Sequence, residues 1–267
     1  MCRAPPPPQP KHNTHTPHEQ STVLQQNVPA ARSLSQTSLA MSHPNLVAST
    51  EAAVRSALQG MDASHDFAHI DRVRRVALSL AAGEGVTDAA TLLVVELGAL
   101  LHDVADWKYS GSDTASGESA ARILAAAGAE APLAARVQAV IAGVGFSSEL
   151  LTGSSGGPLP LEVALVQDAD RLDAIGAIGI ARCFTYGGAK RRPLHDPAVP
   201  PLNDAALRSG GYRDPHRVNT TINHFHEKLL TLKGRMKTRA GARLAEGRHA
   251  FLETFLEQFV GEWDAAR

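Results

Sequence analysis

Residues 100–106 read Leu-Leu-His-Asp-Val-Ala-Asp and close a strongly apolar stretch of the chain. Thr87 and Asp88, which precede that stretch, are good N-cap residues, so we predict a helix from there to Val104. His102 falls on the helical face that carries the apolar residues Val95, Gly98 and Ala99. The pattern therefore places an imidazole, with a carboxylate next to it in sequence, at the buried end of an apolar helix.

Two further stretches have the same character, one on each side of this segment. Residues 65–73 read His-Asp-Phe-Ala-His-Ile-Asp-Arg-Val, and His69 shares a helical face with the apolar residues that follow it. Residues 166–173 read Val-Gln-Asp-Ala-Asp-Arg-Leu-Asp inside a run that is otherwise buried in character. Asp170 lies on the face of the preceding valines, but periodicity alone does not separate Asp170 from Asp168 on a helix buried all round. Both acids therefore stay candidates.

The chain after Asn45 has helical periodicity almost throughout. We predict helices at residues 49–58, 68–82, 88–104, 116–127, 132–144, 161–184, 219–232 and 240–263. Residues 189–217 are predicted to form a basic loop that contains proline. No stretch of useful length alternates with period two, as a half-buried strand would. The sequence therefore predicts an all-α fold, with a single domain over residues 47–267.

Residues 1–46 differ from the rest because they hold half of the chain's 16 prolines and show no hydrophobic periodicity. Such a segment buries too little apolar surface to offset its ordering entropy, so we predict a disordered tail. Two alternatives stay open. The tail is rich in Ser and Thr and poor in acids, as organellar transit peptides are, and Met41 is a second candidate start.

The composition excludes some classes of protein. With a net charge of -1 the chain lacks the basic surplus of a general nucleic-acid binder, so no polymer partner is expected. No apolar run approaches the roughly 20 residues that span a bilayer. Cys2 lies in the predicted tail, so a disulfide with Cys183 is not expected and a reducing compartment is favoured. We therefore expect a soluble, cytoplasmic protein, which organellar targeting by the tail would change.

Two imidazoles and two or more carboxylates near one core are costly to bury unless a cation balances them. His and Asp ligands suit a divalent ion such as Mn²⁺, Fe²⁺, Co²⁺, Mg²⁺ or Zn²⁺. Four protein ligands would leave open positions on a six-coordinate ion for water and a phosphate oxygen. The sequence thus predicts one divalent metal ion, whose identity stays open.

The three motifs in this order and spacing resemble the HD-domain phosphohydrolase superfamily, and more closely its stand-alone branch of YedJ- and YpgQ-like proteins. The resemblance covers roughly residues 48–264, and it implies a helical HD bundle. It also implies that His69, His102, Asp103 and the acid of the third motif hold the metal. The matching element of the superfamily carries Asp170 over, with Asp168 as the runner-up. The implied activity is hydrolysis of a phosphate ester or anhydride, as in a (deoxy)nucleoside triphosphate.

One departure from the wider superfamily concerns a second metal. Some HD proteins carry further histidines in the helix after the HD motif, whereas residues 140–146 here contain none. This disfavours a binuclear phosphodiesterase or oxygenase. A ligand-sensing or scaffold module, in which a metal completes the fold without turnover, is the alternative from a different class.

Further residues border these motifs and are weaker candidates. His65 lies one turn before His69 and is a catalytic or phosphate-contacting candidate, and Asp106 lies four residues after His102 and is a candidate base or orienter of the attacking water. Asp103 would share one ion with His102 and belongs with the catalytic groups. Each of these also fits a purely structural role.

Basic and polar residues supply the candidates for substrate binding, although basic runs are more often solvated faces. A phosphorylated small molecule is the expected partner, and a homodimer stays open. The candidate contacts are Lys108, Arg171, Lys190, Arg191, Asn223, His224, Lys228 and Lys233.

Overall fold

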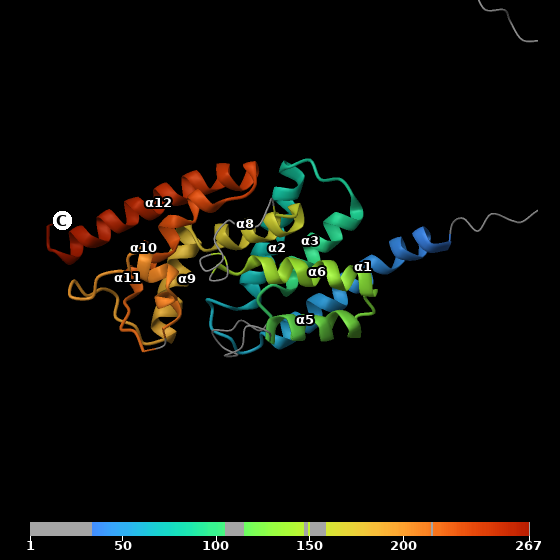
Figure 1. The fold of residues 1–267 in the computed structure, drawn as a ribbon, viewed down its shortest axis with the longest axis horizontal. Coiled ribbons are helices and arrows are strands. Elements are labelled where there is room, and N and C mark those ends of the chain that lie inside the picture. Colours follow the sequence, from blue (N-terminus) through green and yellow to red (C-terminus); the bar gives the residue numbers. More distant parts are fainter. Residues whose placement is uncertain (1–33, 105–114, 147–148, 150–158, 215, 267) are drawn as a thin grey trace, which may run out of the picture.

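The computed structural model describes residues 34–104, 115–146, 149, 159–214 and 216–266, and every regular element in these ranges is a helix (Figure 1). The α-helices are α1 (Leu34–Ala57), α2 (Phe67–Gly83), α3 (Ala89–Leu101), α5 (Ala115–Ala126), α6 (Ala131–Val144), α8 (Leu161–Asp173), α9 (Gly176–Ala189), α10 (Asp204–Arg208), α11 (Thr221–Glu227) and α12 (Arg239–Trp263). Short 3-10 turns lie at Gly211–Arg213, Leu229–Thr231 and Lys233–Arg235. The predicted all-α fold is confirmed.

Helix α8 holds the bundle together because it packs against α2, α3, α6, α9 and α12. Helices α2, α3 and α6 surround it, with α1 and α5 on one side, while α9, α11 and α12 extend the molecule on the other (Figure 1). Leu165 and Leu172 of α8 are completely buried, as are Leu97 and Leu100 of α3. Within the described ranges, no helix is both long and apolar enough to cross a membrane.

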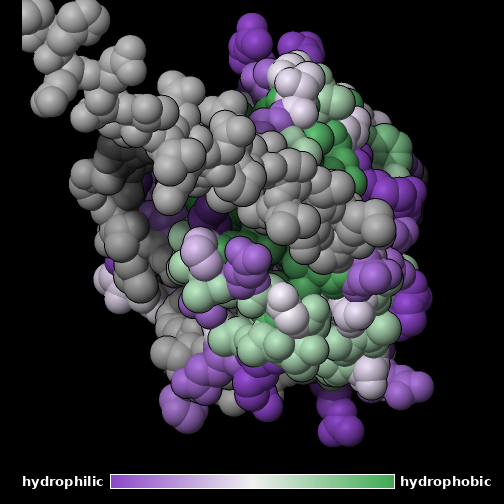
Figure 2. Space-filling view, turned by 90° about the vertical axis from the view of Figure 1, so that its right-hand side faces the viewer, coloured by the Kyte–Doolittle hydropathy of each residue, from purple (hydrophilic) through white to green (hydrophobic). Residues whose placement is uncertain are grey.

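The end of the molecule that holds α1, α5 and α6 has weakly hydrophobic and hydrophilic residues side by side on its surface (Figure 2). Helices α5 and α6 expose alanines here, such as Ala125, Ala135 and Ala139. Alanine is the strongest helix former and exposes little apolar area, which explains why so alanine-rich a chain folds as helices. The exposed large hydrophobic residues of the described part lie outside α1–α6.

The helix predicted over residues 161–184 is in fact two helices. The backbone of Gly176 has a φ of 75°, a left-handed conformation that glycine adopts without strain, and this ends the continuous path after Asp173. Helices α8 and α9 consequently run in different directions (Figure 1). Periodicity missed the break because the apolar pattern continues through it. The break matters for the site, since it turns one face of α9 toward the acids of α8.

The first helix begins earlier than predicted. We expected it to start at Ser49, but α1 starts at Leu34 and continues through Pro44. Leu46, which the prediction assigned to the tail, is buried in the core. The high proline content and the lack of hydrophobic periodicity led us to assign these residues to the tail, and the boundary was therefore placed too late. The predicted disorder of residues 1–33 lies outside the described residues.

Candidate metal and substrate site

His69 and His102 are positioned by the ends of α2 and α3. Asp66 caps the start of α2 by accepting a hydrogen bond from the His69 amide at 3.1 Å, which places His69 in the first turn. Asp88 caps α3 in the same way, and that helix ends at Leu101, directly before His102. Both imidazoles are buried, so the apolar faces bring them into the core as predicted.

The Nδ1 atom of each imidazole lies against an acceptor of the fold. His69 Nδ1 is 2.8 Å from Oδ2 of Asp173, and His102 Nδ1 is 2.9 Å from the carbonyl oxygen of Ala99. Such contacts fix the orientation of a ring and place its proton on Nδ1. The Nε2 atoms are thereby directed at a common space, where the two rings meet edge to face with 5.3 Å between their centroids.

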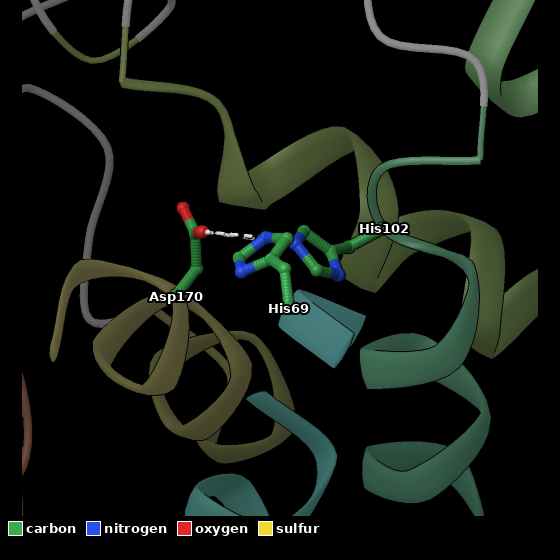
Figure 3. A group of neighbouring side chains, drawn as sticks. All are labelled: His69, His102 and Asp170. Carbon is green, nitrogen blue, oxygen red and sulfur yellow. Dashed lines mark ion pairs between the residues drawn. The ribbon is translucent and has the colours of Figure 1, made fainter. Parts of the chain in front are cut away.

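Asp170 completes this group from α8. Its Oδ1 lies 3.6 Å from Nε2 of His69 and 3.7 Å from Nε2 of His102 (Figure 3). One nitrogen or oxygen atom from each of the three residues lies within 4.8 Å of the others. Asp103 borders the group, with its Oδ2 3.9 Å from Nε2 of His69. The four residues predicted from three separate motifs therefore come together in space.

The environment of His69 provides a test of whether a cation fits here. Its Nε2 atom is buried and makes no hydrogen bond within the described part of the chain. Leaving such an atom unsatisfied costs on the order of 1–3 kcal/mol. A cation bound at Nε2 would remove that cost, and the mixed nitrogen and oxygen donors suit a borderline or hard divalent ion. The residues present therefore fit a divalent metal.

The carboxylates of Asp103 and Asp170 favour a positive charge close to the two imidazoles. Burial lowers the pKa of both imidazoles, but Asp170 and Asp103 raise the pKa of His102 to about 9. Burial also opposes ionisation of Asp170, yet His102 and His69 hold the pKa of Asp170 well below its usual value. Either a proton on the imidazole or a metal cation satisfies this charge distribution.

Asp168, the alternative acid of the third motif, lies in a different environment. Its carboxylate accepts hydrogen bonds of 2.8–3.0 Å from the backbone amides of Lys237 and Thr238 and from the Thr238 hydroxyl. Thr238 in turn caps α12. A Cβ on Gly241 would lie 2.4 Å from Oδ2 of Asp168, so the packing there is tight. Asp168 thus joins α8 to the start of α12, and Asp170 is the acid beside the imidazoles.

A cavity opens beside Asp103 and Asp170, and cationic and aromatic side chains form much of its wall. Five residues predicted for the site line it: His65, Asp103, Asp170, His224 and Lys228. Arg192, which follows the predicted Lys190 and Arg191, lines the cavity as well. Other lining residues were missed from the sequence, among them Arg182, Cys183, Tyr186, Tyr212 and Asn219. The four-residue spacing of Arg182 and Tyr186 on one face of α9 was the available signal, but no motif pointed to it.

Three residues predicted to contact substrate have other partners and are not among the residues that line the cavity. Arg171 is buried and donates hydrogen bonds to Glu149 at 2.5 Å and to the carbonyl oxygen of Arg235 at 2.8 Å. Asn223 donates to the carbonyl oxygen of Val199 at 2.9 Å, and Lys233 lies 3.3 Å from Glu246. The sequence did not predict these partners, because a sequence pattern does not say which face a basic or amide side chain takes.

The other basic candidates are placed as follows. Lys190 and Arg191 are exposed at the end of α9. The Lys190 ammonium lies 5.7 Å from the centre of the Tyr186 ring, near the cavity, and Arg191 adopts a positive φ of 53°. Asp106 and Lys108 fall outside the described residues.

The HD domain family matches residues 66–175, a range that contains His69, His102, Asp103 and Asp170. The YpgQ protein of Bacillus subtilis is 36% identical over 205 residues, which cover 77% of this chain and 87% of that protein. The protein belongs to the HD-domain family.

Solved structures of the family agree with the fold. The crystal structure of an HD-superfamily hydrolase from Bacillus thuringiensis is 38% identical and has a TM-score of 0.59, covering 84% of this chain and 99% of that one. The structure of Bacillus subtilis YpgQ in complex with ADP is 31% identical with a TM-score of 0.60, covering 83% and 97%. The HD family predicted from the three motifs is thereby confirmed.

Proposed function

We propose that this HD-domain protein is a metal-dependent phosphohydrolase that acts on a nucleotide, such as a (deoxy)nucleoside triphosphate. The observation that carries the proposal is the convergence of His69, His102 and Asp170, with Asp103 beside them, on the edge of a cavity with a cationic wall. The relationship to an HD-superfamily hydrolase supports hydrolysis as the class of reaction.

In this proposal His69, His102, Asp103 and Asp170 hold one divalent cation. When bound, such an ion supplies Lewis acidity, which lowers the pKa of a water and polarises a phosphoryl group. Asp173 and the Ala99 carbonyl keep the two imidazoles oriented through Nδ1. Mn²⁺, Fe²⁺, Co²⁺, Mg²⁺ and Zn²⁺ all suit these donors. Asp106 stays our candidate for orienting the attacking water, and His65 stays a candidate phosphate contact from the cavity wall.

The charges that line the cavity favour a phosphorylated substrate. Asp103 and Asp170 line it together with the cations Arg182, Arg192 and Lys228, and Lys228 lies close enough to Asp170 to lower the pKa of that acid. A phosphoryl group beside the carboxylates would need a cation to offset them, whereas the guanidinium and ammonium groups bind phosphate oxygens directly. The ADP bound to YpgQ supports a nucleotide as the class of ligand.

A scaffold or sensing module without turnover is the competing function. It would bind metal and ligand equally well, so binding alone does not separate the two. The separating experiment incubates the purified protein with each of the five cations and a panel of nucleoside mono-, di- and triphosphates, and measures released phosphate and pyrophosphate. We expect release from at least one nucleotide with the wild type and none with His102→Ala. The absence of release from every nucleotide with every cation would favour the scaffold.

A further inference from the structure

Asp173 lies one turn after Asp170 on α8 and collects positive charge from two other helices. Its carboxylate, only 4% exposed, accepts hydrogen bonds from Arg72 at 2.7 and 3.0 Å and lies 3.2 Å from Nη1 of Arg182. His69 Nδ1 is its third partner, at 2.8 Å. This carboxylate is therefore a charged anchor for the His69 ring.

Arg182 differs from Arg72 because it also reaches the other wall of the cavity. Its Nε and Nη2 donate hydrogen bonds to the carbonyl oxygen of Ser64, at 2.9 and 2.5 Å. The Ser64 hydroxyl lies 2.7 Å from Nδ1 of His65, and His65 lines the cavity. One guanidinium thus links the carboxylate that orients His69 to the backbone that carries His65.

We propose that Arg182 is a positioning residue of this site. It fixes the His69–Asp173 pair and the Ser64–His65 turn relative to each other, so the metal side and the substrate side of the cavity keep one geometry. The inference rests on the proposed function, because it assigns His65 to the substrate. Arg182 acts through its two neighbours in this account.

The guanidinium suits this task for a geometric reason. It is planar, permanently charged and presents donors in fixed directions, so it serves a carboxylate and a carbonyl at the same time. Lysine at this position would keep the charge but offers a single ammonium, which does not reproduce both contacts. Arg182→Lys therefore separates loss of geometry from loss of charge.

Arg72 provides the matched control. It donates hydrogen bonds through Nε and Nη2 to the same Asp173 carboxylate, but it is not among the residues that line the cavity. The wild type is compared with four single variants: Arg182→Gln, Arg182→Lys, Arg72→Gln and His65→Ala. It is also compared with the double variants that combine His65→Ala with each arginine substitution. Mn²⁺ affinity is measured by calorimetry without nucleotide, and kcat and KM are measured on the nucleotide that the wild type hydrolyses best.

Two results are expected together. Arg182→Gln and Arg72→Gln each weaken Mn²⁺ binding by about 10-fold, because both release Asp173. The double variant of Arg182→Gln and His65→Ala loses less kcat/KM than the product of the two single losses, by a factor of at least about 5. The reason is that each substitution removes the same positioned His65. The losses of kcat/KM caused by Arg72→Gln and by His65→Ala multiply in their double variant. Arg182→Lys behaves like Arg182→Gln in both measurements and serves in its place if the glutamine variant does not fold.

An unchanged Mn²⁺ affinity, or multiplicative effects of the Arg182 and His65 substitutions, would overturn the proposal even if the wild type is an active phosphohydrolase. Failure of the proposed function has a different signature. The wild type would then release no phosphate, while the Mn²⁺ titrations would still report whether Arg182 supports the His69 side.

Discussion

His69 Nδ1 and Asp173 Oδ2 are 2.8 Å apart, and this contact ties the candidate metal site to the helix that supplies its acid. Asp173 lies one turn after Asp170 on α8. A single rigid helix therefore presents Asp170 as a candidate ligand and also orients the candidate ligand His69. A carboxylate behind a metal-binding imidazole raises the basicity of that imidazole and fixes its ring. The last turn of α8 therefore sets two parts of the geometry at once.

Replacing this carboxylate tests the relationship directly. Asp173→Asn keeps the shape but removes the charge that balances Arg72 and Arg182, and it weakens the hold on His69. We expect divalent metal affinity to fall by about 10–100-fold, measured by calorimetry. Asp71→Asn is the control, since that exposed acid pairs with Arg75 on the outer face of α2. Equal affinities in Asp173→Asn and the wild type would contradict this role.

Glu149 and the three cations around it, Arg171, Arg235 and Lys237, predict that the stability of the fold depends on pH. Burial raises the pKa of Glu149, but Lys237, Arg171 and Arg235 together lower it below 4.5. A carboxyl whose pKa is lower in the folded state stabilises the fold above its unfolded pKa and loses that contribution as the pH falls. The free energy of unfolding, measured in urea, should thus differ most between wild type and Glu149→Gln near neutral pH. The difference should shrink below pH 4.5, and a difference that stayed constant from pH 7 to pH 3 would refute the cause.

The close packing where α8 meets α9 predicts that an added methyl group at Gly179 destabilises the protein. A Cβ on Gly179 would lie 2.2 Å from the carbonyl oxygen of Ala174, so the backbone must move to admit it. We expect Gly179→Ala to destabilise the protein by about 1–3 kcal/mol, seen as a lower melting temperature. Gly188→Ala is the matched control in the same helix, because a Cβ there meets nothing within 4 Å. Equal melting temperatures of the two variants would show that the junction adapts freely.

Much of the fold and the candidate ligands followed from the sequence. Most predicted helices were found within a few residues of their bounds, because capping residues such as Asp88 and glycines marked their ends. His69 and His102 were predictable because each lies on an apolar face at the end of a helix. The two motifs and the acid of α8 had to meet for a physical reason, since a buried acid and buried imidazoles need one another or a cation.

What the sequence left open depended on tertiary contacts. Asp168 and Asp170 differ only in what faces them, and the start of α12 that satisfies Asp168 is far away in the chain. Arg171 lies beside the acids in sequence and was a candidate, whereas Arg182 was not, yet of these two arginines only Arg182 lines the cavity. The turn at Gly176 makes that difference, because it redirects α9, and no periodic pattern records a change of direction.

A calorimetric Mn²⁺ titration of Asp170→Asn and Asp168→Asn decides which acid of α8 belongs to the candidate metal site. Asp170 lies beside the two imidazoles, whereas Asp168 is satisfied by Lys237 and Thr238. We expect Asp170→Asn to remain folded and lose at least about 10-fold in affinity, and Asp168→Asn to melt at a lower temperature while it binds Mn²⁺ like the wild type. Wild-type affinity in Asp170→Asn, or loss of the ion in Asp168→Asn alone, would contradict the assignment of the site.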